Sequence, residues 1–368
     1  MKILQVVHSF PPDMGGIENH VFNLCRELAK KNEVIVLTTR AAGSKEDEVV
    51  SGIRIKRYWC ASAPWFSSVK FAPGLFLDLW GEDADVICSH GYGSLMPFFA
   101  SLVSKIRKKT FVFTLHGYPR IKGIGGLMQK GYRFFIAPWF LSAAKRIISV
   151  TESSLNDIEA EIDLRKVEVI PNGVDVKRFV SKLDIMSLGV NRILYVGRLD
   201  RYKSIDTIIK AVALTERKDI VVRIVGDDEG EKKKLVILAD RLGVKTEFSR
   251  SKYEEITREY ENASMVVLPS KYEGLSLVLL EAISCERPTF STPVGDAPRL
   301  FKEVYGNKAR FFLFENEKEL AGRIEEALKC KKELSLVASK ARKKLIAKYS
   351  WKEVAARTFE VYKRAIRM

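Results

Sequence analysis

Short runs of β-branched residues alternate with amphipathic stretches along nearly the whole sequence, and this alternation restricts the possible folds more than any other feature. Parallel strands need a long crossover connection, which is usually a helix packed on one face of the sheet. The alternation therefore predicts α/β domains with doubly wound parallel sheets. The first series of predicted strands comprises Ile3–Val7, Val34–Thr38, Ile53–Tyr58, Val86–Ser89, Phe111–Leu115, Ile147–Val150 and Val167–Ile170.

A second series of predicted strands begins near residue 190, after a polar stretch of the chain. Because 368 residues exceed what one core usually supports, we predict a Rossmann-like domain over residues 1–175 and another over 190–350. Ligands bind outside the carboxyl ends of such strands, so we expect the domains to face a central cleft. The second series comprises Ile193–Val196, Val221–Val225, Met265–Leu268, Thr289–Ser291 and Phe311–Phe314, and the clearest helices are Ile17–Lys31, Ile205–Thr215, Glu231–Leu242 and Leu275–Ser284.

Composition narrows the class of protein further. The five cysteines form no CxxC pair, which predicts reduced, mostly buried thiols in a cytoplasmic protein rather than disulfides or a structural zinc. The first residues are too soon interrupted for a signal peptide, and no window has the ~18–20 apolar residues of a membrane-spanning helix. Glutamine occurs only at positions 5 and 129 while Lys, Arg and Glu are abundant, a bias typical of heat-adapted proteins.

Two segments that follow predicted strands contain residue types that hold phosphates. Gly15 and Gly16 open the first predicted helix, where backbone N–H groups and the helix dipole favour an anion. Gly197 ends a strand of the second series, and the cations Arg198 and Lys203 that follow it suit a diphosphate. The structural alternatives are an ordinary Gly-Gly turn and a solvated basic turn.

The most informative segment runs from Pro269 to Glu281. Gly274 allows a tight turn, and an apolar helix is expected to start near Leu275 with free N–H groups at its end. Glu273 then lies just before the helix and Glu281 about two turns into it, roughly 10 Å apart along the axis. That separation suits hydroxyl-bearing groups on either side of a pyrophosphate. A carboxylate in an apolar helix is costly unless it is paired, so Glu281 indicates a ligand or a salt bridge.

These segments resemble the family 4 glycosyltransferases, which are retaining enzymes of the two-domain GT-B fold with nucleotide-sugar donors. The Glu273…Glu281 pair matches the E-x7-E motif of the family, and the resemblance covers nearly the whole chain. It implies a hexosyltransferase-type enzyme whose final helix, residues 351–368, rejoins the first domain. The other matching motifs are Gly15–Glu18, Thr114–Gly117, Pro171–Asp175 and Gly197–Lys203.

The resemblance also implies a role for each matching residue. Glu281 should bind the ribose hydroxyls, Glu273 the hydroxyls of the donor sugar, and Asp13 should approach the acceptor. Ser204 departs from the family pattern, in which a glycine usually follows the lysine. The implied catalytic residues are His116, Arg198, Lys203 and Glu273, and the implied donor-binding residues are Gly15, Gly16, Gly197, Arg198, Lys203, Glu273, Gly274, Leu275, Ser276 and Glu281.

The expected chemistry needs neither a metal nor another cofactor. Fixed cations and amide dipoles at the leaving diphosphate can stabilise the negative charge that develops on it. The family is thought to retain the anomeric configuration through attack on the same face, and no side chain here stands out as a covalent nucleophile. Asp83 and Asp85 have the D-x-D spacing of metal-binding transferases, but they precede a strand of the first domain, where a helix-to-strand turn is the favoured interpretation.

The region from Val86 to Ser149 contains ten basic residues and no acidic ones. Basic groups beside exposed apolar ones suit an anionic membrane surface, which predicts a lipid-linked or glycan acceptor at the inner face of the cell membrane. The alternative is that the aromatic residues belong to the core. The basic residues are Lys105, Arg107, Lys108, Lys109, Arg120, Lys122, Lys130, Arg133, Lys145 and Arg146, and the apolar ones are Trp65, Phe66, Phe71, Leu75, Phe76, Trp80, Phe134, Phe135, Ile136, Trp139 and Phe140.

Three other functions compete with transfer from a UDP- or GDP-sugar to such an acceptor. A soluble transferase could act on a small sugar or sugar phosphate. A nucleotide-sugar epimerase has a similar fold but would leave the E-x7-E motif unexplained. A net charge of +16 would suit a non-enzymatic binder of nucleic acid or another anionic polymer, but no nucleic-acid-binding module is present. The donor base is expected near Ser249–Tyr253, which does not distinguish uracil from guanine.

Overall fold

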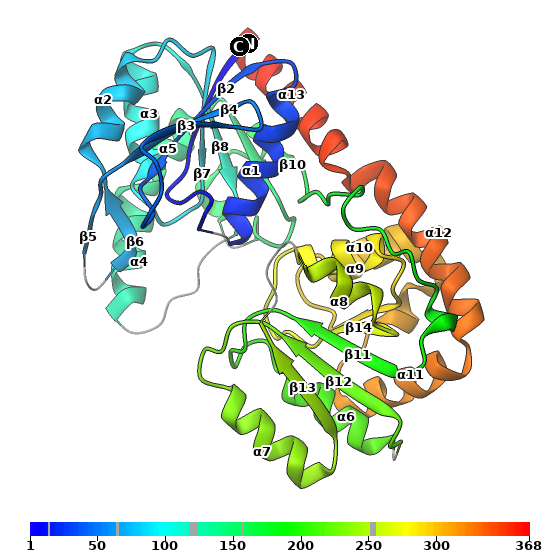
Figure 1. Ribbon diagram of the computed structural model, residues 1–368. Coiled ribbons are helices and arrows are strands. Elements are labelled where there is room, and N and C mark those ends of the chain that lie inside the picture. The colour runs from blue at the N-terminus through cyan, green and yellow to red at the C-terminus, as the bar shows by residue number, and fades with distance from the viewer. Residues whose placement is uncertain (14, 64–65, 118–123, 157, 216, 251–254) are drawn as a thin grey trace. The chain divides into compact units, whose positions relative to one another are not determined.

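The computed structural model describes residues 1–368 except 14, 64–65, 118–123, 157, 216 and 251–254. The chain divides into two compact units (Figure 1). The first unit comprises Met1–Asn172 together with Trp351–Met368, and the second comprises Gly173–Ser350. Each unit is built on its own largely parallel sheet, which confirms the predicted pair of α/β domains.

The first unit contains an eight-stranded sheet in which neighbouring strands are parallel, except for the antiparallel edge strand β3. This antiparallel edge was not predicted, because its four residues are half exposed and carry only a short alternating pattern. A separate antiparallel hairpin is formed by β5 (Ala61–Ala63) and β6 (Phe66–Phe71). The order of the sheet is β10 (Val167–Val169), β9 (Arg146–Ser149), β8 (Thr110–Leu115), β7 (Val86–His90), β1 (Lys2–Val6), β2 (Glu33–Thr39), β4 (Ile53–Tyr58) and β3 (Asp47–Val50).

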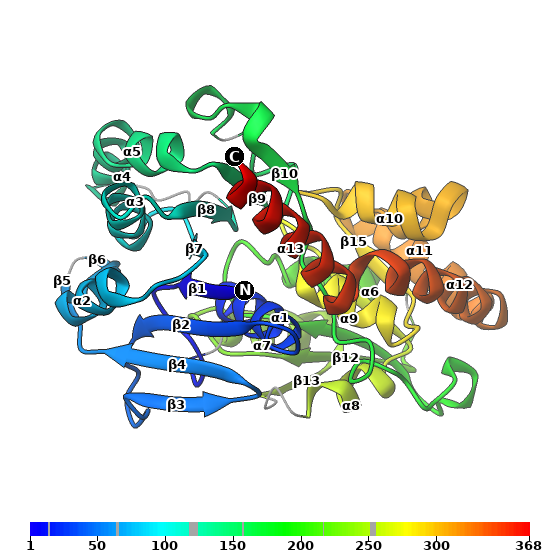
Figure 2. The ribbon, with the colours of Figure 1, turned by 90° about the horizontal axis from the view of Figure 1, so that it is seen from above.

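Helices cover both faces of this sheet, because successive strand residues point to opposite sides. Ile3 packs in a core with residues of α1 (Gly16–Leu28) and α13 (Trp351–Arg367). The next residue, Leu4, packs in a second core with residues of three other helices. These helices lie on the side of the sheet away from α1 and α13 (Figure 2). Those helices are α2 (Pro73–Gly81), α3 (Met96–Ile106) and α5 (Ala137–Ala143), and α4 (Ile124–Phe135) precedes α5 in the chain.

The C-terminal helix α13 is an integral part of the first unit. Its residues Val361 and Tyr362 are fully buried in the same core as β1 and α1. Arg357 Nη2 donates to the backbone oxygen of Val169 at 2.7 Å, and Arg364 pairs with Glu168. The last residues of the chain thus complete the unit that the first residues begin.

The second unit contains a five-stranded, wholly parallel sheet that packs with its helices around one continuous core. The sheet order is β13 (Lys245–Ser249), β12 (Ile220–Val225), β11 (Asn191–Val196), β14 (Met265–Leu268) and β15 (Thr289–Ser291). The helices are α6 (Asp206–Leu214), α7 (Lys232–Leu242), α8 (Ile256–Glu261), α9 (Leu277–Ser284), α10 (Ala297–Tyr305), α11 (Glu317–Lys329) and α12 (Lys331–Tyr349).

The predicted strand Phe311–Phe314 is wrong. Residues Gly306–Phe312 form a 3-10 helix, and only Leu313 makes an isolated parallel bridge, to Ser291. The ring of Phe312 stacks on Tyr305, with 3.8 Å between ring centroids. The aromatic run therefore packs as a compact turn against α10, which an apolar pattern cannot distinguish from a buried strand.

The units meet in the chain between Asn172 and Gly173, slightly before the boundary at 175 that we predicted. The polar stretch before residue 190 is not a free linker. Phe179 and Ile185 are buried in the core of the second unit, and the Ser284 hydroxyl donates to the Phe179 oxygen at 2.6 Å. These two apolar residues attach the stretch to the second unit. They were not predicted as core residues, because the residues around them are polar.

Candidate active site

The order of the second sheet reverses between β11 and β14, since the chain adds β12 and β13 on one side and β15 on the other. Ligands of open parallel sheets bind at such a point, outside the carboxyl ends of the strands. Gly197 directly follows β11, and the segment before α9 follows β14. The two segments touch, because the Lys271 backbone N–H donates to the Tyr202 oxygen at 2.8 Å.

The structure brings together two of the predicted catalytic residues. The Lys203 ammonium pairs with the Glu273 carboxylate, and both side chains are only about one-fifth exposed. Arg198 lies differently, since 64% of its side chain is exposed and its guanidinium pairs with Glu229 at 2.8 Å. The pair with Glu229 uses Nη1 and leaves other N–H groups of this exposed guanidinium for a departing diphosphate.

Two glycines that we did not assign to the site come very close to these segments. A Cβ on Gly226 would lie 1.8 Å from the backbone oxygen of Gly197. Gly295 has a φ of +56°, and a Cβ there would lie 2.2 Å from the Glu273 oxygen and 2.3 Å from the Gly274 oxygen. Both glycines follow β-strands, β12 and β15, and that position was the available signal.

Ser204 adopts the backbone conformation for which glycine is better suited. Its φ is +47°, in the left-handed region that costs a residue with a side chain roughly 1–2 kcal/mol. The residue is buried, and its hydroxyl has no hydrogen-bond partner among the described residues. The departure from the family pattern noted at this position therefore preserves the glycine-like turn.

Helix α9 begins at Leu277, two residues later than predicted, and Ser276 is its N-cap residue. The Ser276 side chain makes no capping hydrogen bond, so it leaves first-turn N–H groups available to an anion. Glu281 is consequently the fifth residue of the helix, and Glu273 precedes the helix by four residues. The predicted separation of two turns along one helix axis therefore does not hold.

Glu281 is buried in the second unit, where the Tyr260 hydroxyl donates to its Oε2 at 2.7 Å. Burial raises the pKa of this carboxyl from 4.5 to about 7, although Tyr260 and Arg178 both oppose the shift. A buried carboxylate of this kind would accept hydrogen bonds from the hydroxyls of a ligand. These bonds would offset part of the free-energy cost of burying its charge.

The raised pKa of Glu281 predicts how stability changes with pH. Between 4.5 and about 7 the folded state retains a proton that the unfolded chain loses, so the free energy of unfolding falls as the pH rises. The shift corresponds to about 3 kcal/mol. The lowered pKa values of His90 and His116 act in the opposite direction over this range, but they are common to both proteins. Urea denaturation without nucleotide, at pH 5 and pH 8, should therefore show the loss as a difference: from pH 5 to pH 8 the wild type should lose stability relative to Glu281→Gln. The exposed Glu326→Gln should behave like the wild type, and an unchanged pH dependence in Glu281→Gln would contradict the assignment.

The first unit places the other predicted residues around the start of α1. Gly15 is the N-cap and Gly16 the first residue of the helix, and both are exposed, as is Asp13. The Glu18 carboxylate lies so close that a Cβ on Gly15 would approach its Oε2 to 2.5 Å. This carboxylate already interacts with the positive end of the helix dipole. The N-terminus of α1 therefore attracts a phosphate less strongly than we expected.

Three histidines cluster at the carboxyl edge of the first sheet. His90 ends β7, His116 directly follows β8, and His20 lies on α1, with their ring nitrogens within 4.8 Å of one another. Such a cluster has the residue types of a metal site. However, both nitrogens of His90 make hydrogen bonds, so an ion at this cluster would have to displace one of these contacts.

A chain of hydrogen bonds fixes the protonation of these rings. The Gln5 amide donates to the Tyr362 hydroxyl at 3.2 Å, so its oxygen accepts from His90 Nε2 at 2.7 Å. His90 Nδ1 then accepts from His116 Nε2 at 3.0 Å, which leaves Nδ1 as the basic nitrogen of His116. Burial and the neighbouring rings hold the pKa of His90 and of His116 well below 6.5, so both are neutral.

The D-x-D pair lies at a turn whose carboxylates are already engaged. Asp83 pairs with Lys109, and Asp85 accepts from the backbone N–H of Lys2 at 2.7 Å. These contacts fit the helix-to-strand turn that we favoured. The segment expected to hold the donor base lies only partly within the described residues, since Ser251, Lys252 and Tyr253 fall outside them.

Sequence models of known protein families match both units of the chain. The sequence model described as Glycosyltransferase Family 4 matches residues 14–178, and the one described as Glycosyl transferases group 1 matches residues 186–344. The chain is a family 4 glycosyltransferase. The two matches together reach into both units and include every predicted site residue except Asp13, which directly precedes the first match.

Similar proteins extend over the whole length of this glycosyltransferase. An uncharacterized glycosyltransferase of Methanocaldococcus jannaschii is 27% identical, with 100% of this chain and 99% of that protein covered. A phosphatidylinositol N-acetylglucosaminyltransferase component from Arabidopsis thaliana is 25% identical, with coverage of 100% and 83%. The structure of HepE from Anabaena in complex with UDP has a TM-score of 0.78 at 19% identity, with coverage of 99% and 100%. HepE is also solved with UDP-glucose.

Proposed function

We propose that this family 4 glycosyltransferase moves a sugar from a UDP- or GDP-sugar to a lipid-linked or glycan acceptor at a membrane surface. We further propose that transfer retains the anomeric configuration and requires no metal. The observation that carries the proposal is the Lys203–Glu273 ion pair at the reversal point of the second sheet, before the uncapped start of α9. The complexes of HepE with UDP and UDP-glucose support a nucleotide-sugar donor.

The chemistry follows from where charge develops. Cleavage of the sugar–phosphate bond leaves positive charge on the anomeric carbon and negative charge on the diphosphate. Lys203 is positioned to neutralise the diphosphate, while Glu273 accepts hydrogen bonds from sugar hydroxyls and holds the Lys203 ammonium in place. Glu281, deeper in the unit, is assigned to the ribose hydroxyls.

His116 is assigned to the sugar, and His90 is expected to orient it. We expect His90→Leu to lower kcat about 10- to 100-fold with little change in KM, because the His116 Nε2–H loses its acceptor. The acidic limb of the pH–rate profile should also move, since His90 helps to set the pKa of His116. His90→Gln keeps a donor and an acceptor and should restore most of the activity. An unchanged pH profile in His90→Leu would contradict the orienting role.

The proposed membrane surface rests on the first unit. One relative is named for phosphatidylinositol, a phospholipid. Large aromatic side chains of the predicted apolar set are exposed, among them Phe134, Phe135 and Trp139. Leu75 and Phe140 of that set are buried instead, because they face the sheet, and Trp65, Arg120 and Lys122 lie outside the described residues. Within the described part of the chain, none of the helices has the length and apolar character needed to cross a bilayer.

A panel of nucleotides tests the proposal directly. Thermal unfolding would be followed with UDP, GDP, ADP and their sugars, each with and without EDTA. A ligand that binds only the folded state raises the apparent stability, so one nucleotide class should raise Tm selectively and EDTA should leave the shift unchanged. If no nucleotide raised Tm, the donor assignment would fall. With the donor that raises Tm, NMR analysis of the anomeric configuration of the product would decide between retention and inversion.

A further inference from the structure

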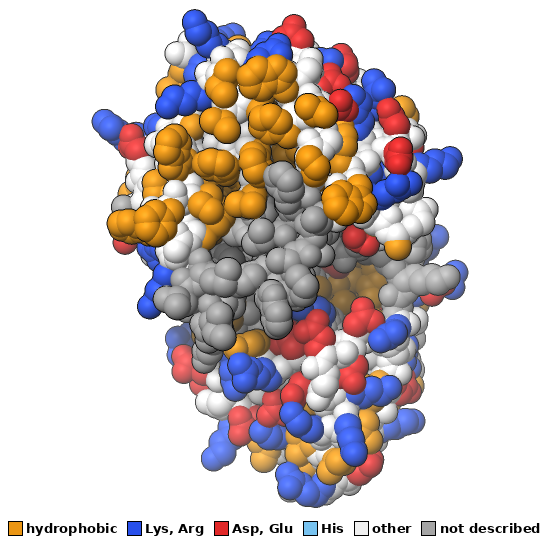
Figure 3. Space-filling view, turned by 90° about the vertical axis from the view of Figure 1, so that its left-hand side faces the viewer, with side chains coloured by type: hydrophobic (Ala, Val, Ile, Leu, Met, Phe, Trp, Pro, Cys, Tyr) orange, Lys and Arg blue, Asp and Glu red, His pale blue; other side chains and the backbone are white. Residues whose placement is uncertain are grey.

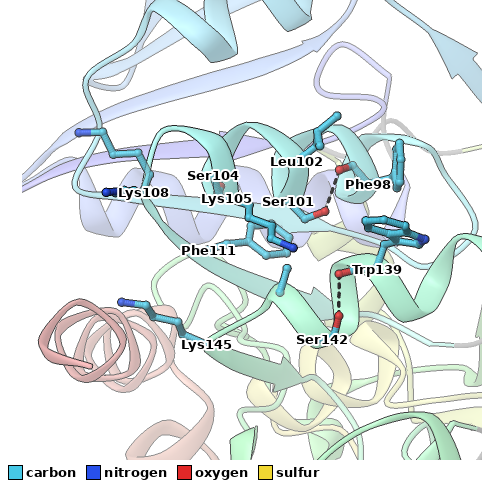
Figure 4. Close-up of a pocket in the computed structure, with 12 residues that line it drawn as sticks. Phe98, Ser101, Leu102, Ser104, Lys105, Lys108, Phe111, Trp139, Ser142 and Lys145 are labelled. Atoms are coloured by element: carbon cyan, nitrogen blue, oxygen red, sulfur yellow. Dashed lines mark hydrogen bonds between the residues drawn. The ribbon is translucent and has the colours of Figure 1, made fainter.

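A basic pocket lies in the first unit, away from the carboxyl edge that holds the histidine cluster. It has a volume of about 490 Å³ and is lined by residues of α3, β8 and α5 and of the segments that precede β8 and β9. Figure 4 shows the Lys105 side chain extending toward Trp139, with Lys108 and Lys145 nearer the other end. The volume is sufficient for a phosphate ester of the size of a phospholipid headgroup.

Four lysines make this pocket strongly positive. Lys109 pairs with Asp83, but among the described residues no carboxylate pairs with Lys105, Lys108 or Lys145. The uninterrupted absence of acidic residues from Val86 to Ser149 removes nearby groups that could compensate them. Ammonium groups gathered at one cavity repel one another, so an anion that binds there relieves this repulsion.

The hydroxyls of the serines that line the pocket are already used as hydrogen-bond donors. The Ser101, Ser104 and Ser142 hydroxyls donate to backbone oxygens of their own helices, at 2.7, 2.7 and 3.1 Å. They consequently present lone pairs rather than protons to a ligand. The binding of an anionic oxygen therefore falls to the lysine side chains.

An exposed apolar patch adjoins the pocket through Trp139. This residue lines the pocket, is 58% exposed and contacts the pocket residue Phe98 edge-on, with 6.4 Å between ring centroids. Figure 3 views the side of the first unit that carries α2 and α4 and shows hydrophobic side chains gathered on it. The exposed large residues that α2 to α5 contribute are Leu77, Trp80, Ile106, Phe134, Phe135 and Trp139.

We propose that the pocket holds the phosphate of an anionic phospholipid headgroup while the apolar patch enters the surface of the bilayer. This inference rests on the membrane surface of the proposed function and gives it a specific lipid contact. A lipid fits both features at once, because its phosphate needs cations and its acyl chains need apolar surface. Tryptophan and phenylalanine at the rim are residue types that favour the interface of a membrane.

Vesicle flotation tests the pocket with the full chain. Vesicles of phosphatidylcholine alone would be compared with vesicles that also contain phosphatidylglycerol, at low salt. The double variant Lys105→Gln/Lys145→Gln should bind the anionic vesicles about 25-fold more weakly, since each lysine near such a surface contributes about a fivefold effect. The control Lys233→Gln/Lys340→Gln removes the same charge from exposed positions of the second unit and should change binding less than about twofold.

The possible results distinguish among the pocket, the membrane surface and the donor site. If the double variant bound as tightly as its control, the pocket would be excluded and a diffuse membrane contact would remain. If glycerol 3-phosphate raised the Tm of the wild type but not of the double variant, while the two proteins bound anionic vesicles equally, the ligand would be a soluble phosphate ester and the lipid assignment would fall. If the wild type ignored both vesicle types, the membrane surface would fall with the pocket, while nucleotide-induced stabilisation would still test the donor site.

Discussion

Lys203→Ala is expected to lower kcat for sugar transfer about 100-fold, with a smaller effect on donor affinity. The Lys203 ammonium is held by Glu273 at the point where the second sheet reverses its strand order. Charge that develops on the departing diphosphate would lose its nearest fixed cation in this variant. Steady-state kinetics with the donor identified by thermal unfolding would measure both parameters.

A matched lysine on α6 controls for the loss of charge. Lys210 pairs with Asp206, and both side chains are about two-fifths exposed, so Lys210→Ala should leave kcat unchanged. Glu273→Ala and the double variant Lys203→Ala/Glu273→Ala complete a cycle. Their effects should be far from additive, because the two residues act as one unit. Wild-type turnover in Lys203→Ala would mean that the leaving group lies elsewhere.

Gly295→Ala is expected to weaken nucleotide binding at least tenfold and to lower Tm by several degrees. The new Cβ would lie 2.2 and 2.3 Å from the backbone oxygens of Glu273 and Gly274, so the segment that carries Glu273 must move. A movement of about 1 Å is enough to cost a large factor in a positioned site. Calorimetric titration with the preferred nucleoside diphosphate and a thermal melt would report the two effects.

Gly243 offers the control for backbone strain without a clash. Its φ of +63° is close to the +56° of Gly295, but the nearest atom to an added Cβ is the Lys218 ammonium nitrogen at 3.9 Å. Gly243→Ala should therefore lower stability by about 1 kcal/mol and leave nucleotide affinity unchanged. Equal nucleotide affinity in Gly295→Ala and Gly243→Ala would show that the Gly295 contact does not shape the donor site.

Much of the fold was predictable because its signals are local. The strand Met265–Leu268 and the position of Glu281 in an apolar helix follow from periodicity within a few residues. The close approach of Gly295 to Glu273 was not predictable in this way, since it joins the end of β15 to the end of β14. Only the stacking of the strands shows that these two loops share one space.

The histidine cluster illustrates the same limit in the first unit. A single histidine after a predicted strand indicated a site at His116, but the groups that fix its protonation come from remote segments. His90 and Gln5 are 85 positions apart, and Gln5 and Tyr362 are 357 positions apart. Sequence patterns do not show that these residues are neighbours in space. The sheet order places β1 beside β7, and the packing of α13 brings Tyr362 to Gln5.

The return of α13 to the first unit has a consequence for biosynthesis. On the ribosome, residues 1–172 emerge long before Val361 and Tyr362, which cover one face of their sheet. At a synthesis rate of roughly 5–20 residues per second, this delay amounts to about 10–40 s. During that interval the apolar face beside β1 and α1 stays uncovered while the second unit is translated and folds. The nascent chain thus carries an incomplete first unit until α13 is made, and for that period it exposes the kind of surface that chaperones bind.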